Sequence, residues 1–419
     1  MKKLFLLTIL ISVFTISCAT KNNKQLQTQH IYSPYYFFAD TLNPYEEITD
    51  KQLHKFIIFD GLAWKGSYLN DKSMVKEDLE LIKNNRNLEN IKGNIKLRYG
   101  FTNERANMRL YPAEETIHRG NPKFDGNQYS SISPFTPLYI AYVSSDGKYY
   151  YCLTDFLRGW IEASKINEYE KEDFIKIQKM DYVRVIRDNT LIGNVTYGIG
   201  DKIPLIAKGI TRIAVLSPDN KKVIIPMENA NYIIGDAIFS ENYMKSIAES
   251  ILNDYYDWGG KEGRHDCSSY VRDLWKVFGA NIPRSTGSQH LVGKTLLKKP
   301  NNAEEFYNVL DTAKPYKTLI FFKGHVILYA GKENNDYIIY HAVSRLKNDS
   351  GDIIEFYKVT RNELKKEGFI NIWQRVTRVI EISPLISPRL PILPEIHSLD
   401  KLEDEIIQYE TFTESISKK

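Results

Sequence analysis

A cysteine at the start of a helical pattern is the residue in this sequence best suited to chemistry. Cys267 follows a loop that contains Gly259, Gly260 and Gly263, and glycines allow a backbone to approach its neighbours closely. The apolar residues after the cysteine have helical spacing: Tyr270, Val271, Leu274, Trp275 and Phe278. The free N–H groups and the dipole of a helix N-terminus favour an anion, and such sites lower the pKa of a cysteine to about 3.5–7.5. The pattern therefore predicts a reactive thiolate.

Two histidines lie symmetrically about a predicted turn, and a thiol nucleophile needs such a base. His325 begins an apolar run, and His341 ends the run 337–341. Because Glu333 is their midpoint, a regular hairpin would set the two histidines opposite each other, with Cβ atoms about 4.5–5.5 Å apart. One imidazole could then take the thiol proton while the other holds it in its working tautomer. A slip of one residue would put the two side chains on opposite faces of the sheet.

The same side chains leave a metal site open as an alternative. His265, Cys267, His325 and His341 are all residue types that zinc binds. However, a His-x-Cys pair at a helix start followed by a hairpin pair is not a familiar zinc spacing, and no glutamate is clearly placed as a general base. The residues therefore favour a thiol mechanism in which no cofactor is expected.

Length and composition describe the protein that positions these residues. The chain has 419 residues, which at about 150 residues per domain predicts about three domains. Apolar residues make up 42% and charged residues 26%, as in ordinary globular proteins. The net charge is only +4 and no long basic run occurs, so no nucleic-acid partner is expected. Three cysteines are too few for a disulfide framework or for a four-cysteine zinc site.

The first 18 residues have the features of an export signal. Lys2 and Lys3 precede the apolar run 4–16, which is shorter than the roughly 20 residues that span a membrane. Ser17-Cys18 at the end of this run resembles the lipobox of bacterial lipoproteins, in which the cysteine is acylated and becomes the mature N-terminus. Residues 1–18 are therefore predicted to be a lipoprotein signal peptide, with Cys18 as the lipidation site. The alternative is a cleaved signal with an incidental cysteine.

The segment that follows the signal changes from polar to helical in character. Residues 19–34 are rich in Asn, Lys and Gln and are predicted to be a flexible tether. Residues 35–95 carry helical signals, among them a capping-box pattern from Thr49 to Gln52. They are predicted to form a small, partly helical domain.

The remaining sequence divides into two strand-rich segments, a mixed segment and a tail. Short alternating runs over residues 96–170 and 171–239 predict two small β-barrels. Residues 240–380 begin with a predicted helix over 240–253 and contain the cysteine and both histidines. The proline-rich tail, residues 381–419, has no assigned role.

The residues suited to chemistry lie in motifs that resemble the NlpC/p60 cysteine peptidases. These motifs are Tyr256-Asp257-Trp258-Gly259-Gly260, Asp266-Cys267-Ser268, Pro283-Arg284-Ser285 with Gln289, Gly324-His325-Val326 and Tyr340-His341. Asn107–Pro112 and Gly159–Ile161 resemble parts of a bacterial SH3 domain. More narrowly, residues 35–380 resemble the subgroup with an N-terminal stabilising domain, two bacterial SH3 domains and a C-terminal papain-like peptidase domain. Such enzymes are γ-D-glutamyl-L-diamino acid endopeptidases, which cut the stem peptides of bacterial cell walls.

The resemblance implies catalytic roles for four residues. Cys267 would be the nucleophile, His325 the general base, and His341 the polar residue that orients this base. Tyr256 would lie beside the nucleophile, where its hydroxyl could help to stabilise the oxyanion.

The resemblance also implies a substrate pocket. Asp266 and Ser268 would line the site of the free amine of an N-terminal L-Ala, since a buried ammonium requires a carboxylate. Asp266 could equally be the N-cap of the helix. Arg284 is interpreted as part of a structural ion pair, and His265 as an exposed loop residue. Ser269 stands where many members have Gly, and His265 stands where the subgroup often has Arg.

Together these observations predict a multidomain α+β protein with a small helical N-terminal domain, two SH3-like β-barrels and a C-terminal papain-like α+β peptidase domain. The resemblance implies a thiol protease of the cell envelope, lipid-anchored and periplasmic or extracytoplasmic, that acts as a monomer on peptidoglycan stem peptides. In the resembled family the SH3 domains pack against the peptidase domain and narrow its cleft, and the short connection over residues 227–240 favours the same packing here. Substrates are therefore expected to be restricted to free peptides with an unblocked L-Ala. A non-catalytic wall-binding lipoprotein is the rival hypothesis.

Overall fold

The computed structural model describes residues 46–57 and 62–382. The predicted signal peptide with Cys18, the tether over 19–34 and all but the first two residues of the tail over 381–419 lie outside these residues. Within the described ranges, no helix is both long enough and apolar enough to cross a membrane.

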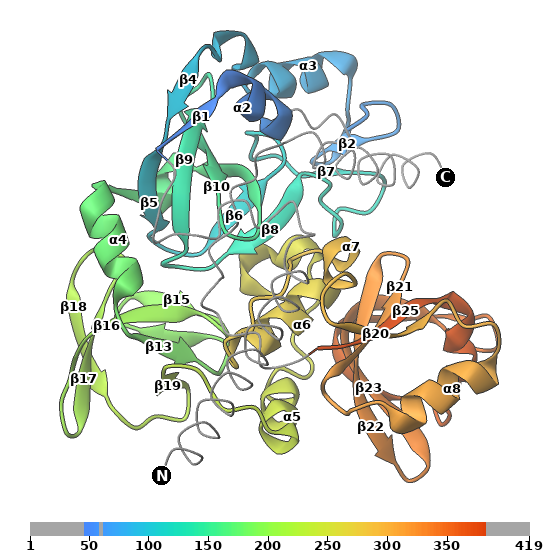
Figure 1. Cartoon of the computed structure of the whole chain (residues 1–419). Coiled ribbons are helices and arrows are strands. Elements are labelled where there is room, and N and C mark those ends of the chain that lie inside the picture. The colour runs from blue at the N-terminus through green and yellow to red at the C-terminus, as the bar shows by residue number, and fades with distance from the viewer. Residues whose placement is uncertain (1–45, 58–61, 383–419) are drawn as a thin grey trace, which may run out of the picture.

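The N-terminal segment packs onto the first β domain and shares its core (Figure 1). Leu53 and Ile57 lie in one cluster with Tyr99, Phe101 and Tyr139 of that domain. The predicted capping box is present, because the side chains of Thr49 and Gln52 each accept a hydrogen bond from the backbone N–H of the other residue. The elements are β1 (Glu47–Thr49), α2 (Asp50–Ile57), β2 (Tyr68–Leu69), β3 (Lys72–Ser73), α3 (Lys76–Asn84) and β4 (Asn94–Lys96).

The first β domain is a seven-stranded antiparallel sheet with the strand order β12-β5-β9-β10-β11-β6-β8. Trp160 and Cys152 are fully buried in its two apolar clusters. A short extra strand, β7, pairs with β2 of the N-terminal segment. The strands are β5 (Arg98–Thr102), β6 (Ala106–Arg109), β7 (Ile117–His118), β8 (Gln128–Ile132), β9 (Pro137–Val143), β10 (Tyr149–Leu153), β11 (Arg158–Glu162) and β12 (Ile166–Tyr169).

The second β domain follows helix α4 (Lys171–Lys179) and has a smaller sheet with the order β18-β17-β16-β13-β19, beside the hairpin β14-β15. Val183, Ile203, Val215 and Tyr232 fill its core. Its strands are β13 (Tyr182–Val185), β14 (Thr190–Ile192), β15 (Val195–Tyr197), β16 (Lys202–Lys208), β17 (Arg212–Leu216), β18 (Lys222–Pro226) and β19 (Tyr232–Ile234).

The C-terminal domain has helices on both faces of a six-stranded antiparallel sheet, in the order β20-β25-β21-β22-β23-β24. Alternate residues of the central strands face opposite sides, as the two-residue period of a strand requires. Leu328 lies in the cluster that contains α5 and α6, whereas Ile327 lies in the cluster that contains α8. The strands are β20 (Lys294–Lys298), β21 (Thr318–Phe322), β22 (His325–Glu333), β23 (Asp336–Lys347), β24 (Ile353–Glu363) and β25 (Val376–Glu381). The helices are α5 (Glu241–Ser250), α6 (Cys267–Lys276), α7 (Thr286–Gln289) and α8 (Ala303–Thr312).

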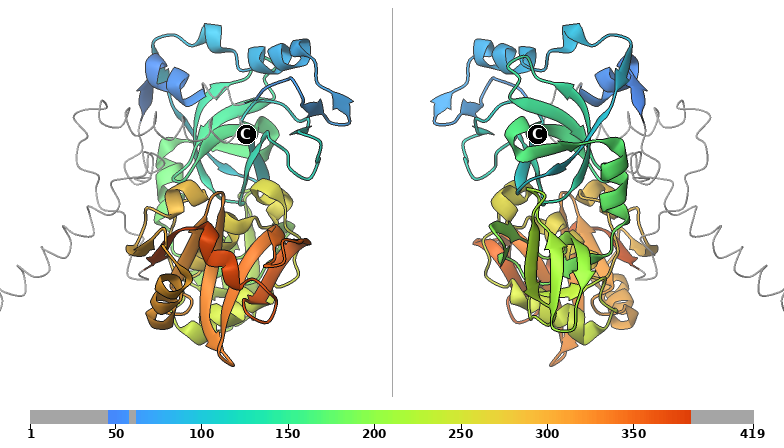
Figure 2. Two further views of the ribbon diagram at one scale, coloured as in Figure 1. Left: turned by 90° about the vertical axis from the view of Figure 1, so that its right-hand side faces the viewer. Right: turned by 90° about the vertical axis from the view of Figure 1, so that its left-hand side faces the viewer.

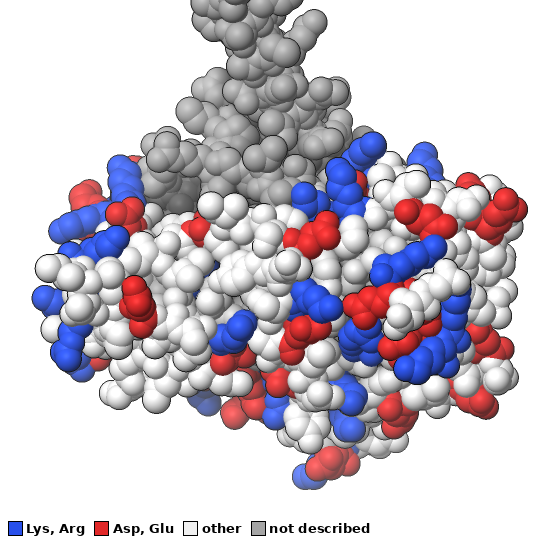
Figure 3. Space-filling model, turned by 90° about the horizontal axis from the view of Figure 1, so that it is seen from below, with Lys and Arg blue, Asp and Glu red and all other residues white. Residues whose placement is uncertain are grey.

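The three units meet around helix α6. In the view of Figure 1 the first β domain lies above, and the second β domain and the C-terminal sheet lie side by side below it, with α6 between them. The turned views of Figure 2 keep the first β domain above the other two units. On the face that Figure 3 shows, basic and acidic side chains are interspersed. The described chain is thus a multidomain α+β protein with two β-sheet domains and a C-terminal α+β domain.

Candidate active site

Cys267 is the first residue of α6, as the sequence pattern predicted. Asp266 caps the helix, because its Oδ1 accepts hydrogen bonds from the backbone N–H groups of Ser268 at 3.1 Å and Ser269 at 2.8 Å. The hydroxyl of Ser269 in turn accepts from the N–H of Asp266 at 2.9 Å. This reciprocal capping box fixes the residue at which the helix begins, and so fixes the position of the cysteine.

The resting form of Cys267 differs from the sequence expectation. The residue is buried, and this burial raises the pKa of its thiol to about 12, with a further increase from the neighbouring Asp266 carboxylate. Hydrogen bonds from the backbone N–H groups of Val326 and Ser268 favour the thiolate but do not offset burial. The prediction of a lowered pKa at the helix N-terminus was therefore wrong, because desolvation of a charged sulfur outweighs the helix end.

The thiol lies against the start of β22. Its Sγ is 4.0 Å from the carbonyl oxygen of Gly324, and the N–H of Val326 also interacts with it. These two residues flank His325 in the chain. The fold therefore brings the cysteine and the first predicted histidine together from segments that are 58 positions apart in the numbering.

The two histidines share one face of the sheet, and His325 Nε2 lies 2.8 Å from His341 Nδ1. The predicted register was nevertheless wrong. The turn lies where the sequence predicted it, as the two-residue loop Asn334-Asn335, but the strands pair about the centre of this loop and not about residue 333. With such a loop and regular pairing, two histidines 16 positions apart would point to opposite faces.

A β-bulge corrects this mismatch. Tyr329 pairs with Ile339 and Gly331 with Ile338, so Ala330 is an extra residue without a partner in this ladder. Beyond the bulge Leu328 pairs with Tyr340. If this register continues for one more residue, His341 lies opposite residue 327. His341 is therefore a diagonal neighbour of His325 on the same face, with a ring-centroid separation of 5.1 Å.

A chain of hydrogen bonds behind His341 determines the tautomer of both rings. The amide nitrogen of Asn362 donates to Glu367 Oε2 at 2.7 Å, so its Oδ1 faces His341 Nε2 at 2.9 Å and accepts from it. His341 then carries its proton on Nε2 and accepts at Nδ1 the proton of His325 Nε2. The Nδ1 of His325 is left unprotonated and able to act as a base. The sequence analysis missed both Asn362 and Glu367.

Both rings are held neutral. Burial, followed by the neighbouring His341 and Arg375, lowers the pKa of His325 well below its ordinary value. Burial also lowers the pKa of His341 to about 4, against a small opposing effect of the Asn362 hydrogen bond. The resting site is thus a neutral thiol beside a neutral imidazole pair.

The predicted pocket residues form a buried ionic cluster. Arg284 pairs with Asp266 through two contacts of 2.6 and 3.0 Å, as the interpretation of Arg284 as a structural ion pair predicted. The same guanidinium donates to the hydroxyls of Ser268 at 2.8 Å and of Ser130 at 2.8 Å. Because Ser130 belongs to β8, the cluster joins the first β domain to the nucleophile helix.

Tyr256 lies close to the nucleophile within an aromatic group that spans two domains. Burial raises its pKa, as does the nearby Cys267, so its hydroxyl remains a neutral donor. Phe124 of the first β domain packs on Tyr256, Trp258 and Tyr357, with ring centroids 5.8–6.5 Å apart. Close contact continues at Gly259, where an added Cβ would lie 2.6 Å from Gln128 Cγ. The first β domain therefore forms one wall beside the candidate site.

The structure places His265 in the interior, with 2% of its surface exposed, and not in an exposed loop as the sequence analysis predicted. Its Nε2 faces Asp188 of the second β domain at 2.7 Å. Because its ring binds Asp188, His265 does not form a cluster with Cys267, His325 and His341. Among residues 46–57 and 62–382, no group of three His, Cys, Asp or Glu side chains is placed to hold a metal ion.

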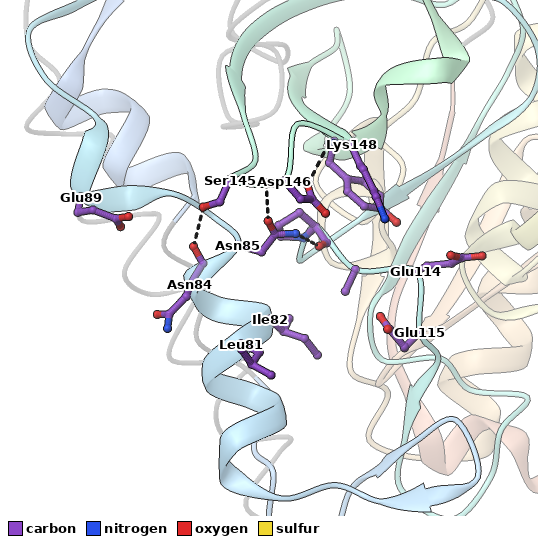
Figure 4. Close-up of a pocket in the computed structure, with 13 residues that line it drawn as sticks. Leu81, Ile82, Asn84, Asn85, Glu89, Glu114, Glu115, Ser145, Asp146 and Lys148 are labelled. Carbon is purple, nitrogen blue, oxygen red and sulfur yellow. Dashed lines mark hydrogen bonds between the residues drawn. The ribbon is translucent and has the colours of Figure 1, made fainter.

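A separate pocket of about 870 Å³ lies outside this site, between α3 and the first β domain (Figure 4). Asn85 at the end of α3 accepts a hydrogen bond from the backbone N–H of Asp146 in the β9–β10 turn. Glu114, Glu115 and Lys148 also line the pocket. None of the predicted site residues belongs to it.

Comparison with known proteins agrees with this architecture. Residues 253–362 match the model of the NlpC/P60 family, and residues 114–162 match an SH3 domain of the SH3b1 type. No curated protein matches the chain. The solved structure of an NlpC/P60 endopeptidase from Photobacterium damselae subsp. piscicida is similar, with a TM-score of 0.66 and 17% identity over 86% of this chain and 93% of that chain.

A further match is an NlpC/P60 family protein from Bacillus cereus, with a TM-score of 0.49 and 16% identity over 68% of this chain and 99% of that one. The first structure supports the fold, and the family model covers the cysteine and both histidines of the site. Residues 253–362 therefore form a domain of the NlpC/P60 family, which is a family of cysteine peptidases, and residues 114–162 belong to an SH3b domain.

Proposed function

We propose that this protein is a cysteine endopeptidase that hydrolyses the bond between γ-D-Glu and the L-diamino acid of peptidoglycan stem peptides with a free N-terminal L-Ala. The observation that carries the proposal is the contact of the Cys267 sulfur with the residues on either side of His325, whose ring bonds to His341. The family implies peptidoglycan as the substrate, and therefore an extracytoplasmic, cell-wall-associated hydrolase.

The neutral resting site supports a mechanism in which the proton moves as the substrate is attacked. His325 Nδ1 takes the proton of the Cys267 thiol, and the sulfur forms a bond to the γ-glutamyl carbonyl carbon. The carbonyl oxygen becomes an oxyanion, which Tyr256 stabilises by donating its hydroxyl proton in a hydrogen bond. Protonated His325 then gives its proton to the leaving amine of the diamino acid. Water, activated by the same imidazole, hydrolyses the thioester and frees the thiol.

The buried cluster beside the nucleophile supports a site for the substrate amine. Asp266 Oδ2 accepts one hydrogen bond, from Arg284 at 2.6 Å, and a carboxylate oxygen can accept more than one. The ammonium of L-Ala would bind there, next to the hydroxyl of Ser268. The Asp266 carboxylate raises the pKa of the Cys267 thiol. A cation bound at this point would weaken that effect and so favour the thiolate.

The wall that the first β domain forms supports the predicted limit on substrates. Phe124 and Gln128 pack directly on the loop that contains Trp258 and Gly259. An acyl or glycan group on the L-Ala nitrogen would remove the positive charge and would have to fit beside this wall. The protein is therefore expected to cut free stem peptides and to leave intact glycan-linked wall uncut.

The deciding experiment is mass spectrometry of L-Ala-γ-D-Glu-meso-diaminopimelate, and of its lysine analogue, after incubation with the whole chain. We expect release of L-Ala-D-Glu, which Cys267→Ala abolishes. Cys152→Ala is the matched control, because Cys152 is buried in the first β domain and its loss should leave the reaction intact. Cleavage that survives Cys267→Ala would disprove the thiol mechanism.

The two rival functions and the lipid anchor have separate tests. Inhibition by a chelator, with no inhibition by iodoacetamide, would favour the zinc hydrolase. Binding to purified wall without cleavage of any peptide, acylated peptides included, would favour the non-catalytic wall-binding protein. The proposed acylation of Cys18 predicts a lipid-modified N-terminal peptide in protein purified from membranes.

A further inference from the structure

His265 is a buried contact between the nucleophile loop and the second β domain. Its Nε2 lies 2.7 Å from Asp188 Oδ2, and Asp188 belongs to the loop between β13 and β14. The other oxygen of this carboxylate accepts a hydrogen bond from the backbone N–H of Ile199 at 2.7 Å. A buried carboxylate requires a counter-charge, and among the ion pairs of the described residues its partner is the imidazole of His265.

Further charges surround the imidazole on its other side. Asp273 of α6 lies 3.8 Å from His265 Nδ1, and Nδ1 has no hydrogen-bond partner. Lys276 at 2.7 Å and Arg272 at 3.5 Å also contact Asp273. Asp254, after α5, and the ring of Tyr270 also lie near the imidazole. Two carboxylates thus face the ring directly, and one of them is already shared with two basic residues.

Arg105 contacts both other units at the junction of the first β domain, the second β domain and the loop before α6. Arg105 of the first β domain pairs with Asp201 of the second at 3.0 Å. An added Cβ on Gly263 would lie 2.6 Å from Arg105 Nε, so the loop that leads to His265 touches the same guanidinium. The His265–Asp188 pair is therefore one part of a packed interface and not a surface contact.

The backbone of His265 is connected to both sides of the candidate site. Its carbonyl oxygen accepts from the N–H of Asp257 at 3.1 Å, and the residue pairs with Tyr256 in a parallel bridge. The next residue is Asp266, which caps α6. A displacement of His265 would consequently move the predicted oxyanion donor and the start of the nucleophile helix together.

We propose that His265, as an imidazolium, is a positioning residue that ties the nucleophile loop to Asp188 of the second β domain and keeps Cys267 and Tyr256 in their reactive arrangement. Its catalytic consequence rests on the proposed peptidase function. In the active form His265 is then a charged imidazolium, whereas His325 is neutral, with its Nδ1 unprotonated. Loss of the His265 proton at alkaline pH leaves Asp188 buried without its counter-charge, loosens the junction and lowers activity.

The direction of the pH effect follows from the surrounding charges. Burial by itself would lower the pKa of His265, but Asp188 first, and then Asp273 and Asp254, raise it above its ordinary value. A group whose pKa is raised by folding stabilises the folded state below its unfolded pKa, and this stabilisation is lost as the pH rises through the folded pKa. The junction is therefore strongest near pH 6.5, where His265 is charged and Asp188, whose pKa His265 lowers, is ionised. It weakens as the pH rises through the raised pKa of His265, and it weakens in acid when Asp188 takes up a proton.

The test combines nuclear magnetic resonance with activity in four versions of the whole chain. These are the parent, His265→Gln, which retains a neutral donor, Asp188→Asn, and the matched control Asp219→Asn at an exposed site of the same β domain. The 13Cε1 signals of the histidines are followed from pH 5 to 9. We expect one signal with a midpoint above 6.5 that is missing in His265→Gln. Asp188→Asn should lower this midpoint by about one pH unit or more, and Asp219→Asn should leave it unchanged.

The activity arm tests the positioning role itself. We expect kcat/KM of the parent to fall on the alkaline side with the His265 midpoint, and Asp188→Asn to shift that fall to lower pH. His265→Gln should show a reduced kcat/KM without this alkaline fall. An alkaline fall that persists unchanged in His265→Gln would overturn the positioning role, and a His265 midpoint at or below 6.5 would overturn the ion pair.

The two proposals fail separately. If no version of the protein cuts a stem peptide, the proposed function is wrong. The titration midpoint of His265 and its response to Asp188→Asn still show whether the His265–Asp188 ion pair exists. If His265→Gln does not fold, Asp188→Asn identifies the His265 signal by its shift. In that case the melting temperature of the parent is measured at pH 6.5 and at pH 9. A melting temperature that does not decrease over this pH range would contradict the proposal.

Discussion

Replacing Arg284 with Met should destabilise the protein far more than the same replacement at Arg98. Both arginines contact a carboxylate at 2.6 Å, but the Arg284–Asp266 side chains are 7% and 10% exposed, and those of Arg98–Glu168 are 44% and 39% exposed. Removing one partner of a buried pair costs about 3–5 kcal/mol, because Asp266 would remain as a buried, unpaired charge.

The exposed pair is the matched control. An exposed ion pair is worth about 0–1 kcal/mol, and Arg98 also lies over the ring of Tyr150 at 4.5 Å, which adds about 0.5–1 kcal/mol. Arg98→Met is therefore expected to cost at most about 2 kcal/mol. The measurement is urea-induced unfolding at pH 7 followed by tryptophan fluorescence, since Trp275 is fully buried in α6.

A second replacement separates the charge from the packing. Asn is as good an N-cap as Asp, so Asp266→Asn in the Arg284→Met background removes the unpaired charge while it keeps the cap. This double variant should be more stable than Arg284→Met alone. Arg284 lowers the pKa of Asp266, and without it the buried carboxyl should have a raised pKa. The penalty of Arg284→Met should therefore shrink as the pH falls from 7 towards 4.

Two results would refute this reasoning. One is an equal loss of unfolding free energy in Arg284→Met and Arg98→Met, which would mean that burial does not set the cost. The other is a double variant less stable than Arg284→Met, because the loss could then not come from an unpaired carboxylate.

Three further predictions concern the catalytic side chains and the wall beside them. Asn362→Leu removes the acceptor of His341 Nε2 and should lower kcat with little change in KM. The expected loss is about 10–100-fold, the range typical of residues that orient metal-bound histidines, and an unchanged kcat in steady-state kinetics would exclude this role. Because burial and His341 lower the pKa of His325, and that of His341 is lowered to about 4, the base stays neutral as the pH falls. The kcat/KM profile should accordingly show no acid midpoint near 6.5, and a midpoint there would contradict the neutral pair. Phe124→Ala should raise the cleavage of an N-acetylated tripeptide relative to the free one, measured by mass spectrometry, whereas an unaltered ratio would show that this ring does not limit access.

The local features of the site could be predicted because they depend on neighbouring residues. Asp266, Cys267 and the apolar residues after them specify a capped helix, and the structure has that helix at the predicted residue. The capping box at Thr49 and Gln52 is of the same kind. In both cases the hydrogen bonds join residues within one turn, so the spacing in the chain determines the geometry.

The features that depend on register or on domain contacts could not be predicted. Asn362 reaches His341 only through the pairing of β23 with β24, and no spacing rule connects positions 341 and 362 before that pairing is known. His265 has polar neighbours in the sequence, yet its partner is Asp188, 77 positions away. The resting state of Cys267 was predicted wrongly for a related reason, since burial by distant segments decides its pKa.

The unpaired Ala330 in β22 makes the hairpin unequally sensitive to single-residue deletions. Removal of Ala330 would turn the bulge into regular pairing and leave the ladder from Leu328 to Tyr340 as it is, so the two imidazoles would still share a face. Removal of any one residue between His325 and Tyr329 would instead rotate His325 to the far side of the sheet. In a library of single-codon deletions selected for peptidase activity, this strand should therefore tolerate a gap at Ala330 and reject gaps at the positions before it.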